Sequence, residues 1–307
     1  MWWEFVLAGL LVGALVGMTG MGGGSLMTPI LVILFGVNPA VAVGTDIAHG
    51  AIFKTVGAFQ HRKMGNVRAQ LAGWMLLGSA PMSLLGVWLA NWLQDNYGSG
   101  VESTMGRVLG GALLFGCVGL LAKSFVHAKS AAADDVDFVL TNRDKLAAVL
   151  IGFFGGFIVG LTSVGSGVFF GLTLLVVFPL RAHKVVGTDI FHAAALLYVA
   201  GFGHFIAGNV DMHIVGWLLL GSIPGVLIGG RLSLSIPENL LRFALATVLG
   251  LSGLKLIDVP GTSVAIVVVL GIGMTALLVY IGRHSWVRYS RGRVPVVPEA
   301  DVGSEPV

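Results

Sequence analysis

Long apolar segments follow one another along almost the whole chain, separated by short polar or glycine-containing breaks. Several of them reach the roughly 20 residues that a helix needs to cross a bilayer. The segments are 5–20, 26–36, 40–60, 69–93, 105–122, 146–162, 168–180, 185–207, 214–230, 240–257 and 262–282. This pattern predicts an all-α polytopic membrane protein, because a transmembrane β-barrel would show short stretches of alternating polarity instead.

The composition agrees with this prediction. Of the 307 residues 56% are hydrophobic and only 11% are charged, whereas soluble globular chains carry about 25% charged residues. The single cysteine, Cys117, excludes an intrachain disulfide and offers no Cys-based metal site. We expect no cofactor, no metal and no nucleic-acid partner, and the oligomeric state is left open. The N-terminus lacks a basic stretch, so we interpret it as part of the first membrane segment rather than as a cleavable signal.

The second half of the chain repeats the first at a constant shift in numbering. Residues 17–89 align with residues 160–232 without a gap, and 29 of the 73 aligned positions are identical. Such self-similarity indicates a duplicated architecture. We divide the chain into a first membrane repeat at 1–125, a linker at 126–144, a second membrane repeat at 145–258, an additional C-terminal transmembrane helix at 259–282 and a tail at 283–307 that we expect to be disordered.

Loop charges predict that the two repeats are inverted. The loop near residues 61–68 carries Arg62, Lys63 and Arg68 in the first copy, but its counterpart in the second copy has no Lys or Arg. The preceding loop reverses this, because only the second copy has basic residues there, Arg181 and Lys184. Basic loops mark the cytoplasmic side, so corresponding loops lie on opposite sides. We expect a cytoplasmic (inner) membrane location, with the N-terminus outside and the C-terminus and the linker inside.

This orientation requires the first two segments of each copy to begin and end on the same face. The second member of each pair has only about a dozen apolar residues, which as a helix covers roughly 18 Å of a ~30 Å core. We therefore predict glycine-broken helical hairpins that dip into the membrane and turn there. Two full crossings by tilted helices are the alternative.

The turns of the two hairpins read TGMGGGS at 19–25 and TSVGSGV at 162–168. Each precedes a helix whose free N–H groups and positive dipole end favour an anion, and glycine-interrupted segments at matching places in inverted halves indicate a transporter's substrate site. Close helix packing at the glycines is the alternative interpretation. The candidate substrate-binding residues are Thr19, Gly20, Gly22, Gly23, Gly24, Ser25, Thr45, Thr162, Ser163, Gly165, Ser166, Gly167 and Thr188.

Two further matching stretches are VGTDIAH at 43–49 and VGTDIFH at 186–192. In each copy the Asp and the His share one helix face, and ionisable residues inside membrane segments are functional candidates because burying them is costly. We predict that Asp46, His49, Asp189 and His192 exchange protons. An alternative role for the two aspartates is to cap the N-terminal ends of their helices. Lower-ranked candidates are Lys54, His61 and His204.

The motif G-x-T-G-x-G-G-G-S-x-x-x-P at 17–29, followed by G-V-x-P-x-x-A-V-G-T at 36–45, resembles the TauE/SafE sulfite and sulfonate exporter family, also called the 4-toluene sulfonate uptake permease family. A weaker copy lies at 160–188, and the resemblance covers about residues 5–282. It implies secondary transport of a small sulfur-containing anion, such as sulfite, a sulfonate or sulfoacetate, coupled to protons. The family includes uptake as well as export, so direction does not follow.

Three functions are thus compared. The first is a secondary anion transporter that works by alternating access between the two repeats. The second is a proton-coupled cation transporter in which Asp46 and Asp189 bind the cation. The third is an intramembrane enzyme, which would need a nucleophile with a base or an asymmetric acid pair; no such set is evident, and we expect the chain not to be an enzyme.

Overall fold

The computed structural model describes residues 2–19, 24–97, 101–125, 140–165, 167–232, 238–266 and 268, and their side chains except at 18, 19, 24, 25, 95, 97, 101–103, 123–125, 230–232 and 238–242. It divides into two units, Met1–Val259 and Pro260–Val307. The first unit holds the ten helices discussed below. Most of the predicted linker, most of the predicted C-terminal helix and the whole predicted tail lie outside the described residues.

The described part of the first unit is built from α-helices alone. They are α1 (Trp3–Thr19), α2 (Gly24–Ile33), α3 (Pro39–Lys63), α4 (Ala69–Tyr97), α5 (Val101–Phe125), α6 (Asn142–Thr162), α7 (Phe169–Val177), α8 (Ala182–Ile206), α9 (Met212–Leu232) and α10 (Glu238–Leu256). Each coincides with one of the apolar segments of the sequence, and the prediction of an all-helical polytopic fold is confirmed.

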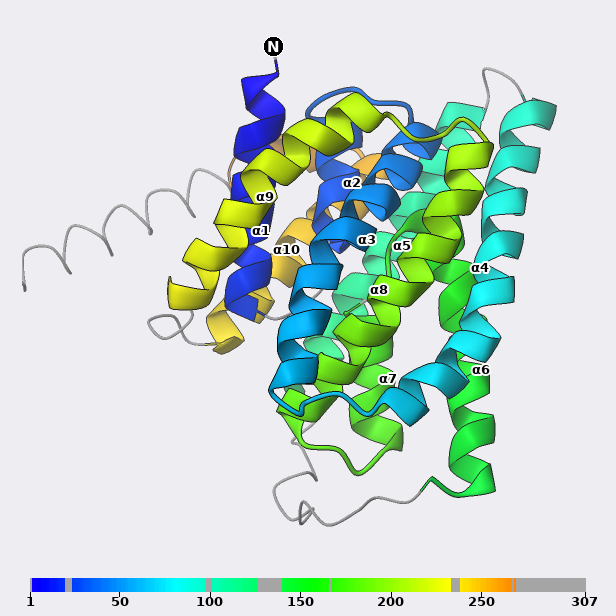
Figure 1. Cartoon of the computed structure of the whole chain (residues 1–307). Coiled ribbons are helices and arrows are strands. Elements are labelled where there is room, and N and C mark those ends of the chain that lie inside the picture. Colours follow the sequence, from blue (N-terminus) through cyan, green and yellow to red (C-terminus); the bar gives the residue numbers. More distant parts are fainter. Residues whose placement is uncertain are drawn as a thin grey trace, which may run out of the picture. The chain divides into compact units, whose positions relative to one another are not determined.

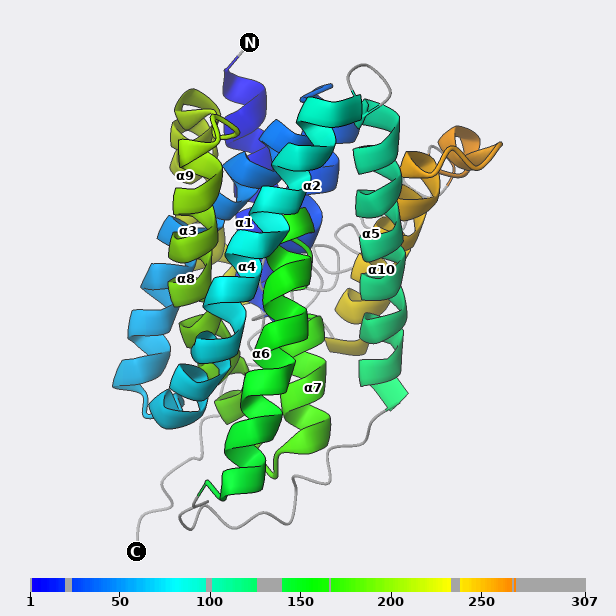
Figure 2. The ribbon, with the colours of Figure 1, turned by 90° about the vertical axis from the view of Figure 1, so that its right-hand side faces the viewer.

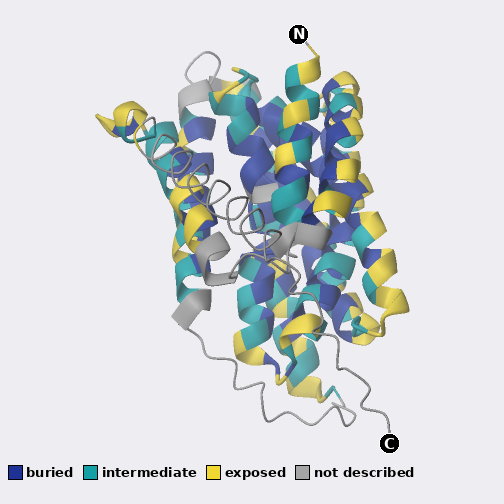
Figure 3. Cartoon of the chain, turned by 90° about the vertical axis from the view of Figure 1, so that its left-hand side faces the viewer, coloured by how far each residue is buried: buried dark blue, intermediate teal, exposed yellow. Residues whose placement is uncertain are grey.

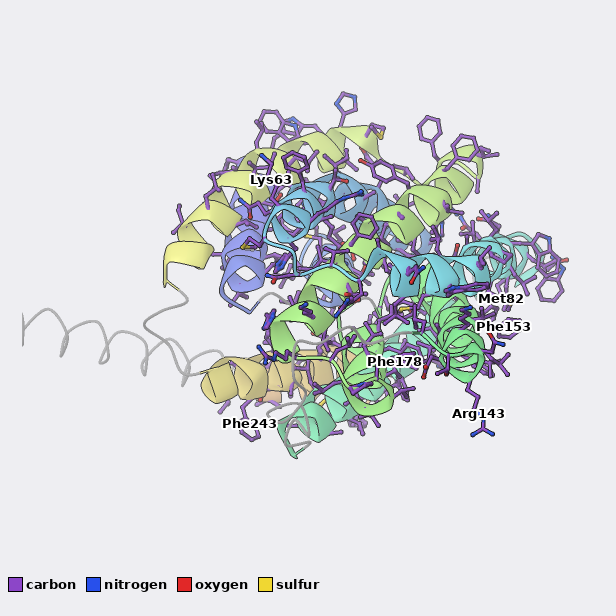
Figure 4. The ribbon with its side chains drawn as sticks, turned by 60° about the horizontal axis from the view of Figure 1, so that its bottom comes forward. Lys63, Met82, Arg143, Phe153, Phe178 and Phe243 are labelled. Carbon is purple, nitrogen blue, oxygen red and sulfur yellow. The ribbon has the colours of Figure 1, made fainter. Side chains whose placement is uncertain are left out.

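Local sequence explains where several helices begin. α3 starts at Pro39, which is suited to the first helical position, and the Asn38 side chain accepts a hydrogen bond from the Ala40 N–H. α6 starts with a reciprocal capping box between Thr141 and Asp144. Figure 4 shows Arg143, in the first turn of α6, pointing away from the neighbouring helices, as Phe243 does on α10.

Five of the helices are long and apolar enough to cross a membrane: those at Ala69–Gln94, Thr104–Ala122, Asn142–Thr162, Ala182–Ile206 and Met212–Gly229. α3 has 25 residues, the same length as α8, but it carries Asp46 and Lys54 within its span. The chain is a multi-pass membrane protein. Many large apolar side chains on the outer faces of the helices are exposed, as lipid contact requires (Figure 3).

The short helices have the lengths that the hairpin prediction needs. α2 has 10 residues and α7 has 9, so each spans only about 15 Å. The rings of Phe5 and Phe35 stack at 4.4 Å, and this contact brings the start of α1 beside the end of α2. The two helices therefore form a hairpin with both open ends on one side. Whether its turn lies at mid-membrane stays a prediction.

α3 and α8, the equivalent helices of the two copies, cross at the centre of the unit (Figure 1). A Cβ atom at Gly50 would lie 3.0 Å from Leu197, and one at Gly57 would lie 3.3 Å from Ile190. Positions thus rise along α3 as they fall along α8, so the two helices are antiparallel. A helix that runs antiparallel to its own copy is the arrangement that an inverted repeat requires.

The fourth helix of each copy packs against the first helix of the other copy. α1 lies along α9, and α4 lies along α6 (Figures 1 and 2). Glycines allow close approach in both pairs: a Cβ at Gly9 would meet the Leu218 carbonyl oxygen at 2.3 Å, and one at Gly152 would meet the Met75 carbonyl oxygen at 2.0 Å. Gly9 and Gly152 are related by the shift that aligns the two copies, so the two contacts are equivalent. The repeats are therefore interleaved rather than side by side.

Candidate transport site

The buried carboxylate of Asp46, on α3, accepts hydrogen bonds from both halves of the protein. Thr28 on α2 donates its hydroxyl to Oδ2 at 2.5 Å, and Ser163, in the second glycine turn, donates its hydroxyl to the same oxygen at 2.9 Å. Asp46 is 1% exposed. The two hydroxyl groups come from different copies of the repeat. The first hairpin and the second hairpin therefore meet at a single carboxylate oxygen.

The capping interpretation of the two aspartates is wrong. α3 begins at Pro39 and α8 at Ala182, so Asp46 and Asp189 each stand about two turns inside their helices. Both are buried, and a capping residue would instead lie just before the first helical turn. Their burial therefore needs another explanation than the helix termini.

The second glycine turn presents two different surfaces. Ser163 adopts a left-handed conformation with φ 61° and ends α6, which directs its hydroxyl to Asp46. Gly165 lies beside a small cavity of about 30 Å³ whose lining is apolar. The N–H groups of Phe169 and Phe170, at the start of α7, bond the Gly165 carbonyl. The open helix end expected from the sequence is thus partly closed, and the Ser163 side of the turn is the polar one.

The remaining candidate residues of the two glycine turns are only partly described by the structure. The Thr162 hydroxyl donates to the Ile158 carbonyl at 2.7 Å and so binds its own helix, and Gly167 has φ 96°. Gly20, Gly22, Gly23 and Ser166 lie outside the described residues, as do the side chains of Thr19 and Ser25; Gly24 is the first residue of α2.

The two histidines of the VGTD…H stretches form equivalent bonds. His49 Nε2 lies 2.9 Å from the Ser222 hydroxyl oxygen on α9, and His192 Nε2 lies 2.8 Å from the Ser79 hydroxyl oxygen on α4. Both pairs are related by the shift that aligns the two copies. Each histidine therefore bonds the helix that the other copy contributes. The rings also contact aromatic side chains: His49 stacks on Phe53 with ring centroids 5.6 Å apart, and His192 and Phe170 make a T-shaped contact with centroids 4.5 Å apart.

Lys54 adds a charge that the repeat does not duplicate, because residue 197 is leucine. Its side chain is 3% exposed. The charges of Asp189 and Asp46 both act on it, and the Lys54 charge acts in turn on His49 and His192. We call Asp46, His49, Lys54, Asp189 and His192 the central charged cluster. All five lie on the crossing pair α3 and α8.

Thr45 and Thr188 hold loops rather than an open site. The Thr45 hydroxyl oxygen accepts a hydrogen bond from the Asp211 N–H, and the Thr188 hydroxyl oxygen accepts one from the Arg68 N–H, both at 3.0 Å. The two bonds are equivalent in the repeat. Each ties the start of one crossing helix to the loop that leaves the end of the other, and both threonines are buried.

The structure also describes the positions of the two lower-ranked histidines, His61 and His204. His204 is fully buried and its Nε2–H donates to the Gly160 carbonyl at 2.9 Å. His61, its equivalent, is half-buried at the end of α3. His204 thus links α8 to α6, whereas His61 lies nearer the surface.

Sequence reasoning missed three residues of this site. Ser79 and Ser222 stand in the matching stretches GSAP and GSIP, and this duplicated serine, together with the nearby Pro, was the available signal. Thr28 had no such signal, because its equivalent is Gly171. Only the packing of α2 against α3 brings its hydroxyl to Asp46.

Two larger cavities lie near opposite ends of α3. One of about 470 Å³ is lined by residues that include Asn38, Pro39, Lys255 and Asp258. The other, of about 210 Å³, is lined by 67–71 and Leu140. The first lies at the start of α3, about 12 Å along the helix from Asp46. Among the described residues, no three His, Cys, Asp or Glu side chains gather as metal ligands would.

The chain is similar in sequence to known membrane proteins. The chain is 39% identical over 254 residues to the probable membrane transporter protein YjnA of Bacillus subtilis, covering 83% of this chain and 99% of that protein. It is 26% identical over 267 residues to the probable membrane transporter protein MJ0441 of Methanocaldococcus jannaschii, covering 81% of this chain and 92% of that protein. No solved structure shows a significant match to the present chain.

A family model described as sulfite exporter TauE/SafE matches residues 5–256. The match spans all ten helices of the first unit almost completely, including both hairpins and the central charged cluster. The resemblance inferred from the glycine motif is confirmed, and the chain belongs to the TauE/SafE sulfite exporter family of membrane transporters.

Proposed function

We propose that the protein is a secondary transporter of a small sulfur-containing oxyanion, of the sulfite, sulfonate or sulfoacetate type, coupled to protons. The observation that carries the proposal is the Asp46 carboxylate, which two hydroxyl groups from different hairpins bind at one oxygen. A carboxylate and a sulfonate present similar acceptor oxygens to such donors. The donors that hold Asp46 are therefore suited to an oxyanion as well.

Proton coupling follows from competition for these donors. While Asp46 is ionised, its oxygen occupies the hydroxyl groups of Thr28 and Ser163 and repels a second anion. A proton on Asp46 removes this repulsion and weakens its hold on both hydroxyls, because charged acceptors bind more strongly than neutral ones. An arriving anion then takes the hydroxyls. Anion and proton therefore bind together, and the anion brings its charge into a region that already holds Lys54.

The interleaved helices change how alternating access would work. One repeat rocking as a whole against the other would break the extensive contacts of α1 with α9 and of α4 with α6. We propose that the moving units are instead α1, α2, α3 and α9 on one side and α4, α6, α7 and α8 on the other. The crossing of α3 and α8 is the surface between them, and the cavity beside Asn38 is a route to it.

We also propose the orientation that the loop charges favour, with the N-terminus outside. The α3–α4 loop then faces the cytoplasm, and Arg62 and Lys63 lie there over the rings of Phe191 and Phe59 at 5.5 and 4.4 Å. A membrane-impermeant reagent should label a cysteine at the exposed Met64 only after cells are permeabilised, on a Cys117→Ala background. Labelling in intact cells would contradict this orientation and indicate the opposite one.

The function is tested by flux into proteoliposomes. Sulfite, sulfate, thiosulfate and taurine are each offered with and without an imposed pH gradient. We expect flux of at least one sulfur oxyanion that the gradient accelerates, and Asp46→Asn should transport it without a response to the gradient. Flux of none of these anions, together with flux of a cation that Asp46→Asn abolishes, would favour the cation transporter and contradict the proposal.

A further inference from the structure

Lys54 breaks the two-fold relation at the centre of the protein. Asp46, His49, Asp189 and His192 all have equivalents in the other copy, but the equivalent of Lys54 is Leu197. Both side chains are buried, Lys54 at 3% and Leu197 at 1% exposure. A buried ammonium group in a membrane protein is costly unless it is paired, so its single occurrence between two matched carboxylates needs a reason.

The register of the crossing helices places Lys54 between the two carboxylates. Gly57 on α3 lies against Ile190 on α8, so Asp189 lies about one turn from Lys54 along the helix pair, or roughly 6 Å. Asp46 lies two turns away on the other side, or about 12 Å along α3. Side chains on a helix tilt toward its N-terminus at the Cβ atom, which puts Asp46 within the directions that a long lysine side chain can take.

The two carboxylates are held differently. Thr28 and Ser163 donate to Asp46, but the equivalents of these residues are Gly171 and Gly20, which carry no hydroxyl. Along the crossing helices Asp189 lies about one turn from Lys54, whereas Asp46 lies about two turns away. The hydroxyl groups thus hold Asp46, while Asp189 is the carboxylate nearer to Lys54 along the helix pair.

We propose that Lys54 is an exchangeable counter-ion, which pairs with Asp189 in one access state and with Asp46 in the other. The carboxylate that Lys54 leaves is the one that binds a proton in that state. Since the two carboxylates lie toward opposite ends of the crossing helices, the exchange links proton binding to the side on which the site is open. This inference rests on the proposed proton-coupled transport and assigns it a switching residue.

The groups that face Lys54 define its electrostatics. On α3 and α8 they are the two aspartates and the two histidines of the central charged cluster. The hydroxyl groups around that cluster come from four other elements: α2, α4, the turn after α6, and α9, through Thr28, Ser79, Ser163 and Ser222. With both histidines neutral, one ammonium group balances one of two carboxylates. One proton is therefore enough to make the cluster neutral in either state.

The two-fold relation offers a sharp test. Lys54→Leu removes the counter-ion, and Lys54→Leu with Leu197→Lys returns it at the equivalent position on α8, between the same two carboxylates. We expect Lys54→Leu to lower gradient-driven flux by roughly tenfold or more, since it leaves a buried charge uncompensated. The double variant should recover most of the flux. Wild-type protein is measured first, because absence of gradient-driven flux there would refute the proposed function rather than the exchange.

Two results would contradict the proposed exchange of Lys54 between the carboxylates. Wild-type flux and gradient response in Lys54→Leu would overturn the exchange. So would an inactive double variant that elutes as a monodisperse species with the wild-type thermal midpoint, since Lys54 would then act only from its own position.

A second measurement covers the case in which the double variant misfolds. Single cysteines replace Val67 and Val210, the equivalent half-buried positions of the two loops after α3 and α8, on the Cys117→Ala background. Asp46→Asn and Asp189→Asn, which each leave Lys54 one carboxylate, should shift their maleimide labelling rates in opposite directions. Shifts in the same direction, or none, would overturn the proposal.

Discussion

His49 on α3 and Ser222 on α9 are hydrogen-bonded at 2.9 Å although they lie far apart in the sequence. The equivalent bond joins His192 on α8 to Ser79 on α4 at 2.8 Å. In each case the histidine belongs to one repeat and the serine to the other. The bond at each buried Nε2 atom is made with the other repeat, so the interleaving of the fourth helices contributes to the candidate site as well as to the packing.

Removing either serine hydroxyl should destabilise the protein by a similar amount. Ser222→Ala and Ser79→Ala each leave a buried imidazole nitrogen without this partner, at a cost of about 1 kcal/mol. The thermal midpoint in detergent measures the loss. Ser83→Ala is the matched control, because Ser83 is also buried on α4 but its hydroxyl bonds the Ala80 carbonyl of its own helix. A loss in Ser83→Ala equal to that in Ser79→Ala would contradict the assignment.

Glycines at the α4–α6 and α1–α9 contacts should be intolerant of a methyl group. A Cβ at Gly152 would lie 2.0 Å from a backbone oxygen of Met75, and one at the equivalent Gly9 would lie 2.3 Å from that of Leu218. Backbone cannot move aside as a side-chain end can, so each alanine should cost about 1–3 kcal/mol of stability. Thermal unfolding of the purified variants gives the measurement.

The control for these variants lies on the partner helices, α4 and α9, against which Gly152 and Gly9 pack. Gly73 on α4 and Gly216 on α9 are equivalent to each other, and a Cβ there would meet no atom within 4 Å. Alanine at these positions should be neutral or should stabilise by up to about 1 kcal/mol, because glycine is a poor helix former. If all four alanine variants lost the same stability, the packing interpretation would fail.

The Ser163 hydroxyl should matter for anion affinity more than for folding. Ser163→Gly removes the hydroxyl that reaches Asp46 and also relieves the positive φ of 61°. A hydrogen bond to a charged group contributes about 1.5 kcal/mol or more, so the apparent affinity for the transported anion should fall roughly tenfold. Concentration-dependent flux measures it.

Thr173→Val serves as the comparison for that variant. Its hydroxyl bonds the Phe169 carbonyl within α7 at 2.8 Å and does not reach Asp46. Anion affinity in Thr173→Val should stay at the wild-type value. Unchanged affinity in Ser163→Gly would remove Ser163 from the site.

The helices could be predicted from the apolar composition of local segments, and the duplication could be predicted from the identity between the two halves of the sequence. Apolar segments such as 69–93 and 185–207 became α4 and α8 with shifts of a few residues. The interleaving could not be predicted, because nothing in the repeat tells whether α9 packs within its own copy or against α1. It depends on glycine contacts such as Gly9 with Leu218, whose partners belong to different copies and lie far apart in the sequence.

Only part of the candidate site could be predicted from the sequence, and its function stays a prediction. Asp46, His49, Asp189 and His192 stood out because they are charged or titratable, buried and duplicated. Their partners did not, since Thr28 has a glycine as its equivalent and an isolated threonine in an apolar helix carries no distinctive pattern. The capping interpretation failed because the helix start depends on Asn38 and Pro39, which lie several residues before the VGTD stretch.

His204 should be structural, and a comparison with its equivalent tests this. Its Nε2–H donates to the Gly160 carbonyl within the core, and His204→Ala would leave that buried oxygen without its donor, costing about 1–3 kcal/mol. His204→Gln keeps a donor and should recover part of the stability. His61→Ala, at a half-buried position, should change stability by less than about 0.5 kcal/mol. Flux per folded molecule should be retained in all three variants, whereas abolished flux in His204→Ala at wild-type stability would instead make His204 a member of the proton path.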